Sequence, residues 1–353
     1  MELTTVWFLI VGVLLIGYFI LDGFDFGVGM AMPFVSRDDV DRRVVINTIG
    51  PIWDLNETWL IVAGAALFAA FPEWYATMFS GFYLALLLIL LALILRGVSF
   101  EYRHKGNTAQ WRAWFDQFII WGSVLPPLLW GVAFANLIHG VPLSTVEGGG
   151  WMYDGTLLTL LNPYSLLGGI VVLLLCFNHG LVYLALKAVG GVQERAQALA
   201  NKVGLVTIVA AASFIVWTIV EHLNNDNLVL IIGFAALAAV SLIGSWLLNM
   251  KHREGWAFTL NAATIAFALL MIFSALFPNL MISSTDPAMS MTVEGAASSP
   301  RTLQLMTWTA VFTLPFVLGY QAWTFWVFRK RVSRSYITSD PREAEEPAKP
   351  AKA

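Results

Sequence analysis

The sequence predicts an all-α integral membrane protein with nine transmembrane helices, its N-terminus outside and its C-terminus in the cytoplasm. Three observations predict this fold. Hydrophobic residues make up 58% of the chain and charged residues 12%, whereas an average soluble domain is about 25% charged. Nine stretches are mostly apolar over about the 20 residues that a helix needs to cross a bilayer. Lysine and arginine residues gather in alternate loops, as they do in membrane proteins.

The apolar stretches make residues 1–338 one transmembrane domain. No stretch has the alternating pattern of a membrane β-barrel, and lipid tolerates only helices or closed barrels. The first stretch is interpreted as a retained span, because Met1 and Glu2 do not form the basic segment that begins a signal peptide. The predicted spans cover residues 5–34, 51–70, 75–98, 113–138, 163–187, 203–221, 227–249, 256–278 and 303–328.

The basic residues set the predicted orientation, because cytoplasmic loops collect Lys and Arg. With the spans above, every Lys and Arg except Arg301 falls on one side of the membrane. A missed or invented span would break this alternation. Residues 339–353 are rich in Pro, Ala, Glu and Lys and cannot bury a core, so we expect a disordered cytoplasmic tail.

Charge and cysteine content exclude some classes of function. A net charge of −3 gives no reason to expect a nucleic-acid partner. The single cysteine, Cys176, lies in an apolar run, so the chain forms no internal disulfide. The sequence has no P-loop or dinucleotide-binding glycine motif and no metal-ligand spacing of Cys and His.

Carboxylates occur inside two predicted spans. A charge at the bilayer centre costs about 2.5–3.5 kcal/mol, which makes such residues functional candidates. Asp22 and Asp25 lie near the end of the first span, and Asp54 and Glu57 lie near the start of the second. The members of each pair are three residues apart and share a helix face.

The predicted topology brings these carboxylates to the cytoplasmic half of the bundle. Arg96 ends the third span on that side, Glu101 follows it, and Asp116 opens the fourth span there. Such a cluster can pass protons inward from the cytoplasm. A structural interpretation stays open, because the helix dipole favours Asp54 in a first turn and Arg96 can extend its charged end to the interface.

Other polar and small residues in the spans are expected to be structural. Gly23 and Gly27 form a G-x-x-x-G motif, which allows a neighbouring helix to approach closely. Gln321 is expected to make an interhelical contact. His179 is the one histidine well inside a span, and we expect a hydrogen-bonded core residue with Tyr183 as a candidate partner. No second imidazole faces it for a bis-histidine haem, so any redox metal is expected in a partner protein.

Several motifs occur together in an order typical of one family. The sequence resembles subunit II of the cytochrome bd-type quinol oxidases from Val6 to about Arg334. The motifs are Asp22-Gly23-Phe24-Asp25-Phe26-Gly27-Val28-Gly29, Arg42-Arg43 with Asn47, Trp53-Asp54-x-Asn56-x-x-Trp59, Ala69-Ala70-Phe71-Pro72, Ser80-Gly81-Phe82-Tyr83, Pro126-Pro127 with Gly131-Val132-Ala133-Phe134, Leu161-Asn162-Pro163 and Met306-Thr307-Trp308.

The resemblance implies a haem-poor subunit of a respiratory terminal oxidase in the bacterial plasma (inner) membrane. Such a complex oxidises quinol and reduces dioxygen to water. It generates proton-motive force without pumping protons. Two b haems and haem d are ligated by subunit I, with which subunit II forms a heterodimer core. A structural quinone is implied in some members. The resemblance leaves open whether the quinol is menaquinol or ubiquinol and whether small accessory subunits join the complex.

The resemblance also implies roles for individual residues. Asp54 matches a carboxylate on the family's proton path, and Asp25 matches an aspartate nearby. Trp59 matches a tryptophan at the mouth of a proposed oxygen channel. Arg96 and Glu101 match residues near the cytoplasmic entrance. With the other two span carboxylates, the expected proton-path residues are Asp22, Asp25, Asp54, Glu57, Arg96 and Glu101.

Two positions depart from the family pattern. Leu55 stands where the family usually has Gly, and Gly97 where Pro is common. Leu55 adds bulk beside Asp54, so we expect helix contact or water access there to differ.

Two other functions stay open. A stand-alone ion-coupled transporter can also use carboxylates within the membrane. In a purely structural assembly subunit, Asp25 and Asp54 would only hold helices together.

Overall fold

The computed structural model describes residues 2–146 and 149–338, so the predicted tail 339–353 lies outside the described residues. The described chain is almost entirely helical. Its long helices are α1 (Leu3–Val35), α3 (Trp53–Ala70), α5 (Tyr83–Tyr102), α6 (Ala109–His139), α8 (Pro163–Lys187), α9 (Gly191–Glu221), α10 (Leu228–Met250), α11 (Glu254–Leu276) and α12 (Pro300–Val327). The shorter elements are α2 (Asp39–Ile49), α4 (Pro72–Gly81), α7 (Leu157–Leu160), α13 (Arg334–Thr338), a 3-10 turn η1 (Pro287–Met289) and strands β1 (Leu143–Thr145), β2 (Trp151–Tyr153), β3 (Asn279–Met281) and β4 (Met291–Thr292).

The predicted class, an all-helical membrane protein, is confirmed. Within the described residues, eight helices are each long and apolar enough to cross a bilayer: α1, α5, α6 and α8 to α12. Helix α3 brings the number of candidate spans to nine when it is taken together with α4. The predicted orientation of the spans stays a prediction.

The predicted third span, residues 75–98, began too early. The chain bends by 120° between α3 and α4, and the helix that crosses is α5. Pro72 is the first residue of α4, where the missing backbone N–H is tolerated and a new helix direction can begin. Thr77 of α4 donates a hydrogen bond to the carbonyl of Trp151 at 3.1 Å, which ties α4 to the β1–β2 hairpin. No Lys or Arg lies between α3 and α5, so the charge alternation did not mark where the crossing helix begins.

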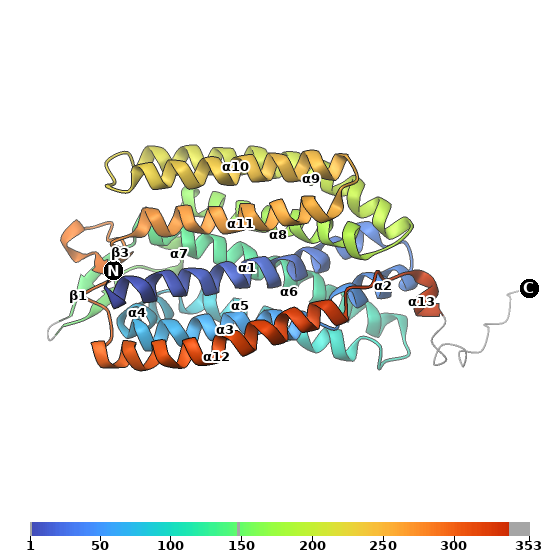
Figure 1. Ribbon diagram of the computed structural model, residues 1–353, viewed down its shortest axis with the longest axis horizontal. Coiled ribbons are helices and arrows are strands. Elements are labelled where there is room, and N and C mark those ends of the chain that lie inside the picture. The colour runs from blue at the N-terminus through green and yellow to red at the C-terminus, as the bar shows by residue number, and fades with distance from the viewer. Residues whose placement is uncertain (1, 147–148, 339–353) are drawn as a thin grey trace, which may run out of the picture.

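The long helices lie side by side along one axis (Figure 1). The N-terminus, β1 and β3 lie at one end of the bundle, and α2 and α13 lie at the other. Helix α12 runs along one edge and α10 along the opposite edge. Helix α1 lies between them and packs against α3, α6, α8 and α11. The helix ends that the charge distribution predicts to be cytoplasmic are therefore at the end that carries α2 and α13.

Helices α1 and α8 cross with their backbones in contact at Gly27 and Gly180. A Cβ atom on Gly27 would lie 2.0 Å from the carbonyl oxygen of Cys176 and 2.6 Å from Cα of Gly180. A Cβ on Gly23 would meet the Cys176 sulfur at an ordinary 3.5 Å. The close approach expected from the G-x-x-x-G motif is therefore confirmed at Gly27. Helices in lipid associate through such packing, because burial from water does not drive them together.

The segment after α12 folds back onto the end of the bundle that carries α2. Lys187 donates to the backbone carbonyls of Phe328 and, at 2.9 Å, Lys330. Arg334 pairs with Asp38 at 2.8 Å and with Asp41 at 2.5 Å. The Arg334 guanidinium, helped by the backbone N–H of Asp41, holds the pKa of the Asp38 carboxyl below its usual value. These contacts fasten α13 to α2.

Replacement of Gly27 by alanine is expected to destabilise the protein, because the added methyl group overlaps backbone atoms that cannot move aside. Overpacking of this kind costs about 1–3 kcal/mol. The midpoint of thermal unfolding in detergent measures the effect. Gly233→Ala is the matched control, since a Cβ there meets no atom within 4 Å. Equal midpoints for the two variants would contradict the assigned crossing.

Candidate functional site

A buried arginine joins three helices at the centre of the candidate site. Arg96 of α5 has no exposed surface, and its Nη2 donates to Oδ1 of Asp22 on α1 and to Oε2 of Glu57 on α3, the latter at 3.3 Å. The guanidinium carbon lies 4.2 Å from the ring centroid of Phe26, a favourable cation–π distance. Arg96 therefore does not extend to the interface, and it pairs with carboxylates inside the bundle.

A glycine on a fourth helix makes room for this arginine. A Cβ on Gly122 of α6 would lie 2.7 Å from Cβ of Arg96 and 2.7 Å from the carbonyl oxygen of Ala92. Helices α5 and α6 can therefore approach until the base of the arginine side chain is covered. The guanidinium is then held away from lipid and close to α1.

Asp25 is held by a second chain of polar contacts. Asn56 of α3 donates to Oδ2 of Asp25 at 2.8 Å. Gln321 of α12 donates to Oδ1 of Asn56 at 3.1 Å, and its own oxygen accepts from Nε1 of Trp59 at 3.5 Å. This chain links α1, α3 and α12. The interhelical contact expected for Gln321 is confirmed.

The two buried aspartates each have one oxygen without a partner among the described residues. These atoms are Oδ2 of Asp22 and Oδ1 of Asp25, and the Tyr18 hydroxyl, also without a partner there, lies near the Asp22 carboxyl. Nε and Nη1 of Arg96 are likewise without a partner there. Both aspartates have no exposed surface. Buried polar atoms are nearly always hydrogen-bonded in native proteins, so these free oxygens and donors mark a place where further polar contacts are expected.

Two predicted site residues lie apart from the buried cluster. Asp54 is exposed on the outer side of α3, and Glu101 is exposed near the end of α5. Asp116 forms a separate group with Arg103 at 2.6 Å and Arg42 at 2.9 Å. The expected gathering at one end of the bundle is therefore confirmed for Asp22, Asp25, Glu57 and Arg96. Asp54, Glu101 and Asp116 lie at the same end of the bundle but outside the buried cluster. The role of the predicted residues in a proton path stays a prediction.

Two residues that shape the site were not predicted from the sequence. Asn56 appeared only as part of a motif, although an amide beside Glu57 in an apolar span was a usable signal. Gly122 stands between Trp121 and Ser123 with no pattern to distinguish it. Its role depends on how α5 crosses α6. A local sequence pattern does not predict that crossing.

His179 is a core residue, as expected. Its Nε2 lies 3.1 Å from the carbonyl oxygen of Ile20, and its ring stacks on Phe258 with centroids 4.6 Å apart. The expected contact with Tyr183 is wrong, because the Tyr183 hydroxyl donates to the carbonyl of Thr48. Among the residues that the structure describes, no three His, Cys, Asp or Glu side chains are grouped to hold a metal ion.

Comparison with known proteins identifies the family. Residues 3–328 match the family model described as cytochrome bd terminal oxidase subunit II. The chain belongs to this family. It is 41% identical over 333 residues to the cytochrome bd ubiquinol oxidase subunit 2 of Bacillus subtilis, covering 94% of this chain and 97% of that one. It is 39% identical over 362 residues to the cytochrome bd-I ubiquinol oxidase subunit 2 of Escherichia coli K12, covering 94% and 96%.

A solved structure has the same fold. The bd oxidase from Geobacillus thermodenitrificans superposes with a TM-score of 0.75 over 93% of this chain and 99% of the compared chain, at 17% identity. The resemblance read from the sequence motifs is therefore confirmed. This subunit II chain is a multi-pass membrane protein, and its family assembles a haem-containing oxidase.

Replacement of Arg96 by leucine is expected to lower stability by about 3–5 kcal/mol, because it leaves buried carboxylates unpaired. The midpoint of thermal unfolding of the purified complex reports the loss. Arg96→Leu combined with Asp22→Leu is expected to regain part of it, since both charges of that pair are then removed. Arg301→Gln, an exposed arginine at the other end of the bundle, is the control. If Arg96→Leu unfolds at the same temperature as Arg301→Gln, the buried cluster does not support the fold.

Proposed function

We propose that this chain is the haem-poor subunit of a quinol:oxygen oxidoreductase, which scaffolds a haem-bearing subunit I and supplies a route for protons from the cytoplasm. The observation that carries the proposal is the buried cluster of Asp22, Glu57 and Arg96, with Asp25 held beside it by Asn56. Intramembrane carboxylates that face the bundle interior mark proton relays in many membrane proteins.

The overall reaction defines what the protons are for. Two quinol molecules release four electrons and four protons. One dioxygen molecule takes up four electrons and four protons and becomes two waters. Haem groups held by the partner subunit would supply the electron transfer in this reaction. Ubiquinol is the quinol in the names of the relatives, and we propose a quinol of this class as substrate.

The residues of this chain can hold and pass protons for that reaction. One guanidinium faces three carboxyl groups, so the carboxyls can bind protons while Arg96 stays paired. Asp22 is fixed through one oxygen by Arg96, and Asp25 through one oxygen by Asn56. The second oxygen of each is left to accept a proton or a hydrogen bond. A fixed carboxyl with one free oxygen suits a relay better than a mobile one.

Asp54 supports a proton entry at the contact with the partner subunit. It precedes Glu57 by three residues on α3 and is exposed, whereas Glu57 is half-buried toward Arg96. An exposed carboxylate in the first turn of a span is costly in lipid and is better accommodated against protein or water. We propose that α3 and the neighbouring α12 face subunit I, so that its residues complete the route to the haem site. Glu101, exposed at the end of α5, is proposed at the cytoplasmic entrance.

Trp59 is proposed at the mouth of an oxygen path on the same face. Its ring packs against Gly17, where a Cβ would lie 2.3 Å from the ring atom Cε3. Its Nε1 is held by Gln321 of α12. The side chain is therefore fixed at the seam between α3 and α12.

The structural quinone implied by the family fits an apolar cavity between α1, α3, α4, α5 and α6. The cavity has a volume of about 300 Å³. Trp74 and Trp130 line it, and the indole N–H of each is buried without a partner among the described residues. Quinone ring oxygens accept hydrogen bonds, so these two residues would hold the ring and the apolar walls would cover its tail. The bound ring would fill the cavity and accept hydrogen bonds from the two indole N–H groups.

Replacement of Asp54 by asparagine is expected to lower oxidase turnover by at least about tenfold, because a group that transfers protons is lost. The fold should persist, since the Asp54 side chain is exposed. Oxygen consumption with quinol, measured beside the reduced-minus-oxidised haem spectrum of the copurified complex, tests this.

Asp226→Asn is the matched control, an exposed carboxylate at the opposite end of the bundle. Unchanged turnover in Asp54→Asn would overturn the proton role. Loss of the haem spectrum together with turnover would assign Asp54 to assembly. Purification without any haem-bearing partner would favour the transporter interpretation.

Replacement of Trp59 by alanine is expected to change the KM for dioxygen several-fold while turnover at saturating dioxygen is kept. The reason is that the fixed ring at the seam is removed without loss of a buried charge. Oxygen consumption at graded dioxygen concentrations measures both quantities. Trp256→Ala, at an exposed tryptophan of α11, should leave KM unchanged. An unaltered KM in Trp59→Ala would remove Trp59 from the oxygen path.

A further inference from the structure

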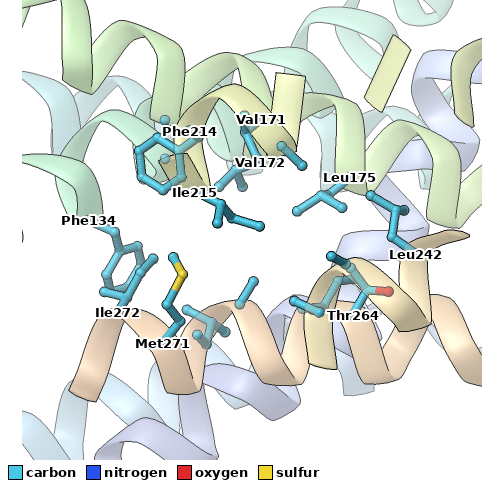
Figure 2. Close-up of a pocket in the computed structure, with 18 of the residues that line it drawn as sticks. Phe134, Val171, Val172, Leu175, Phe214, Ile215, Leu242, Thr264, Met271 and Ile272 are labelled. Carbon is cyan, nitrogen blue, oxygen red and sulfur yellow. The ribbon is translucent and has the colours of Figure 1, made fainter. Parts of the chain in front are cut away.

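A second cavity lies in the other half of the bundle, between α8, α9, α10 and α11. Its volume is about 140 Å³. Figure 2 shows an open space framed by Val171, Val172, Phe214 and Ile215 on one side and by Met271 and Ile272 on the other. Phe134 of α6 lines both this cavity and the one that contains Trp74 and Trp130.

This cavity offers no free nitrogen or oxygen hydrogen-bond donor. Thr264 is the one hydroxyl residue that lines it, and its hydroxyl already donates to the carbonyl of Leu260 at 2.9 Å. The walls are otherwise aliphatic, aromatic, glycine or sulfur-containing, with Cys176 among them. An apolar cavity of about 150 Å³ stays dry and takes apolar molecules. A polar head group would find no partner here, in contrast to the cavity beside Trp74 and Trp130.

The cavity is long and runs parallel to the helices. Its lining extends from Gly168 to Cys176 on α8 and from Thr264 to Ile272 on α11, which is about 12 Å along each helix. The hydrocarbon core of a bilayer is about 30 Å thick, so one leaflet contributes about 15 Å. The cavity therefore matches most of the depth of one leaflet. It lies toward the end of the bundle that carries the N-terminus.

The cavity reaches the lipid-facing side of the bundle between α9 and α10. Ala212 of α9 and Ile243 of α10 line it and are also exposed. The neighbouring linings, Ala211 and Ala238, are small side chains that leave the gap open. Helix α10 forms the edge of the bundle opposite to α12 (Figure 1), away from the proposed contact with subunit I.

We propose that this cavity binds one acyl chain of a membrane phospholipid, inserted between α9 and α10 from the leaflet nearer the N-terminus. The length, the apolar walls and the side opening all fit a single hydrocarbon chain whose head group stays at the membrane surface. The bound chain fills a void that would otherwise weaken the contact of α9 and α10 with α8 and α11. The proposal rests on the membrane fold and does not depend on the oxidase reaction.

The test uses the complete complex in nanodiscs of phosphatidylethanolamine with bromine atoms on carbons 9 and 10 of its chains. A cryo-electron microscopy map is expected to show chain density with bromine peaks between α9 and α10, inside the cavity. Native mass spectrometry of the same complex is expected to show one more retained phospholipid in the wild type than in Ala239→Phe, which fills the cavity.

Ala236→Phe, on the exposed side of the same helix, is the matched control and should retain the wild-type number of lipids. An empty cavity, a compact molecule or a quinone chain in the map would overturn the proposal. So would equal lipid retention in Ala239→Phe and the wild type. If Ala239→Phe does not assemble, the map of the wild type decides.

Discussion

The buried guanidinium of Arg96 sets the arrangement of the helices around it. A charge removed from water is tolerated only when it is paired and hydrogen-bonded, and the partners of Arg96 come from two other helices. Helices α1, α3 and α5 must therefore keep one relative position along the membrane normal. Asp25, Asn56 and Gln321 then extend the same constraint to α12. One ion-pair cluster thus fixes both the helix register and the location of the candidate proton route.

Small residues make this polar centre possible. At Gly122 and at the Gly27–Gly180 crossing, backbones approach more closely than any Cβ would allow. The two sides of the bundle then differ in character. On the α3 and α12 side, amide and indole groups link helices and Asp54 faces outward. On the α9 and α10 side, alanines leave an apolar cavity that opens toward lipid. This division suits a subunit with a protein partner on one side and lipid on the other.

The membrane class and most span boundaries could be predicted from the sequence, because length and hydropathy are local properties. The start of the third span could not, since no basic loop precedes α5 and only the bend at Pro72 separates residues 72–81 from α3. The gathering of Asp22, Asp25, Glu57 and Arg96 followed from topology. The outward direction of Asp54 and the contribution of Gly122 did not, because both depend on how a helix is rotated against its neighbours.

The depth of the buried aspartates has an electrical consequence. Helix α1 ends at Val35, so Asp25 lies about 15 Å from that end of the helix. On the proposed route, a proton that reaches Asp25 from the α2 end has crossed part of the voltage drop across the bilayer. A full crossing by one charge is worth about 2.3 kcal/mol per 100 mV. The protonation of this carboxyl would therefore depend on the membrane potential as well as on the pH. Each proton taken up would move charge through part of the membrane field.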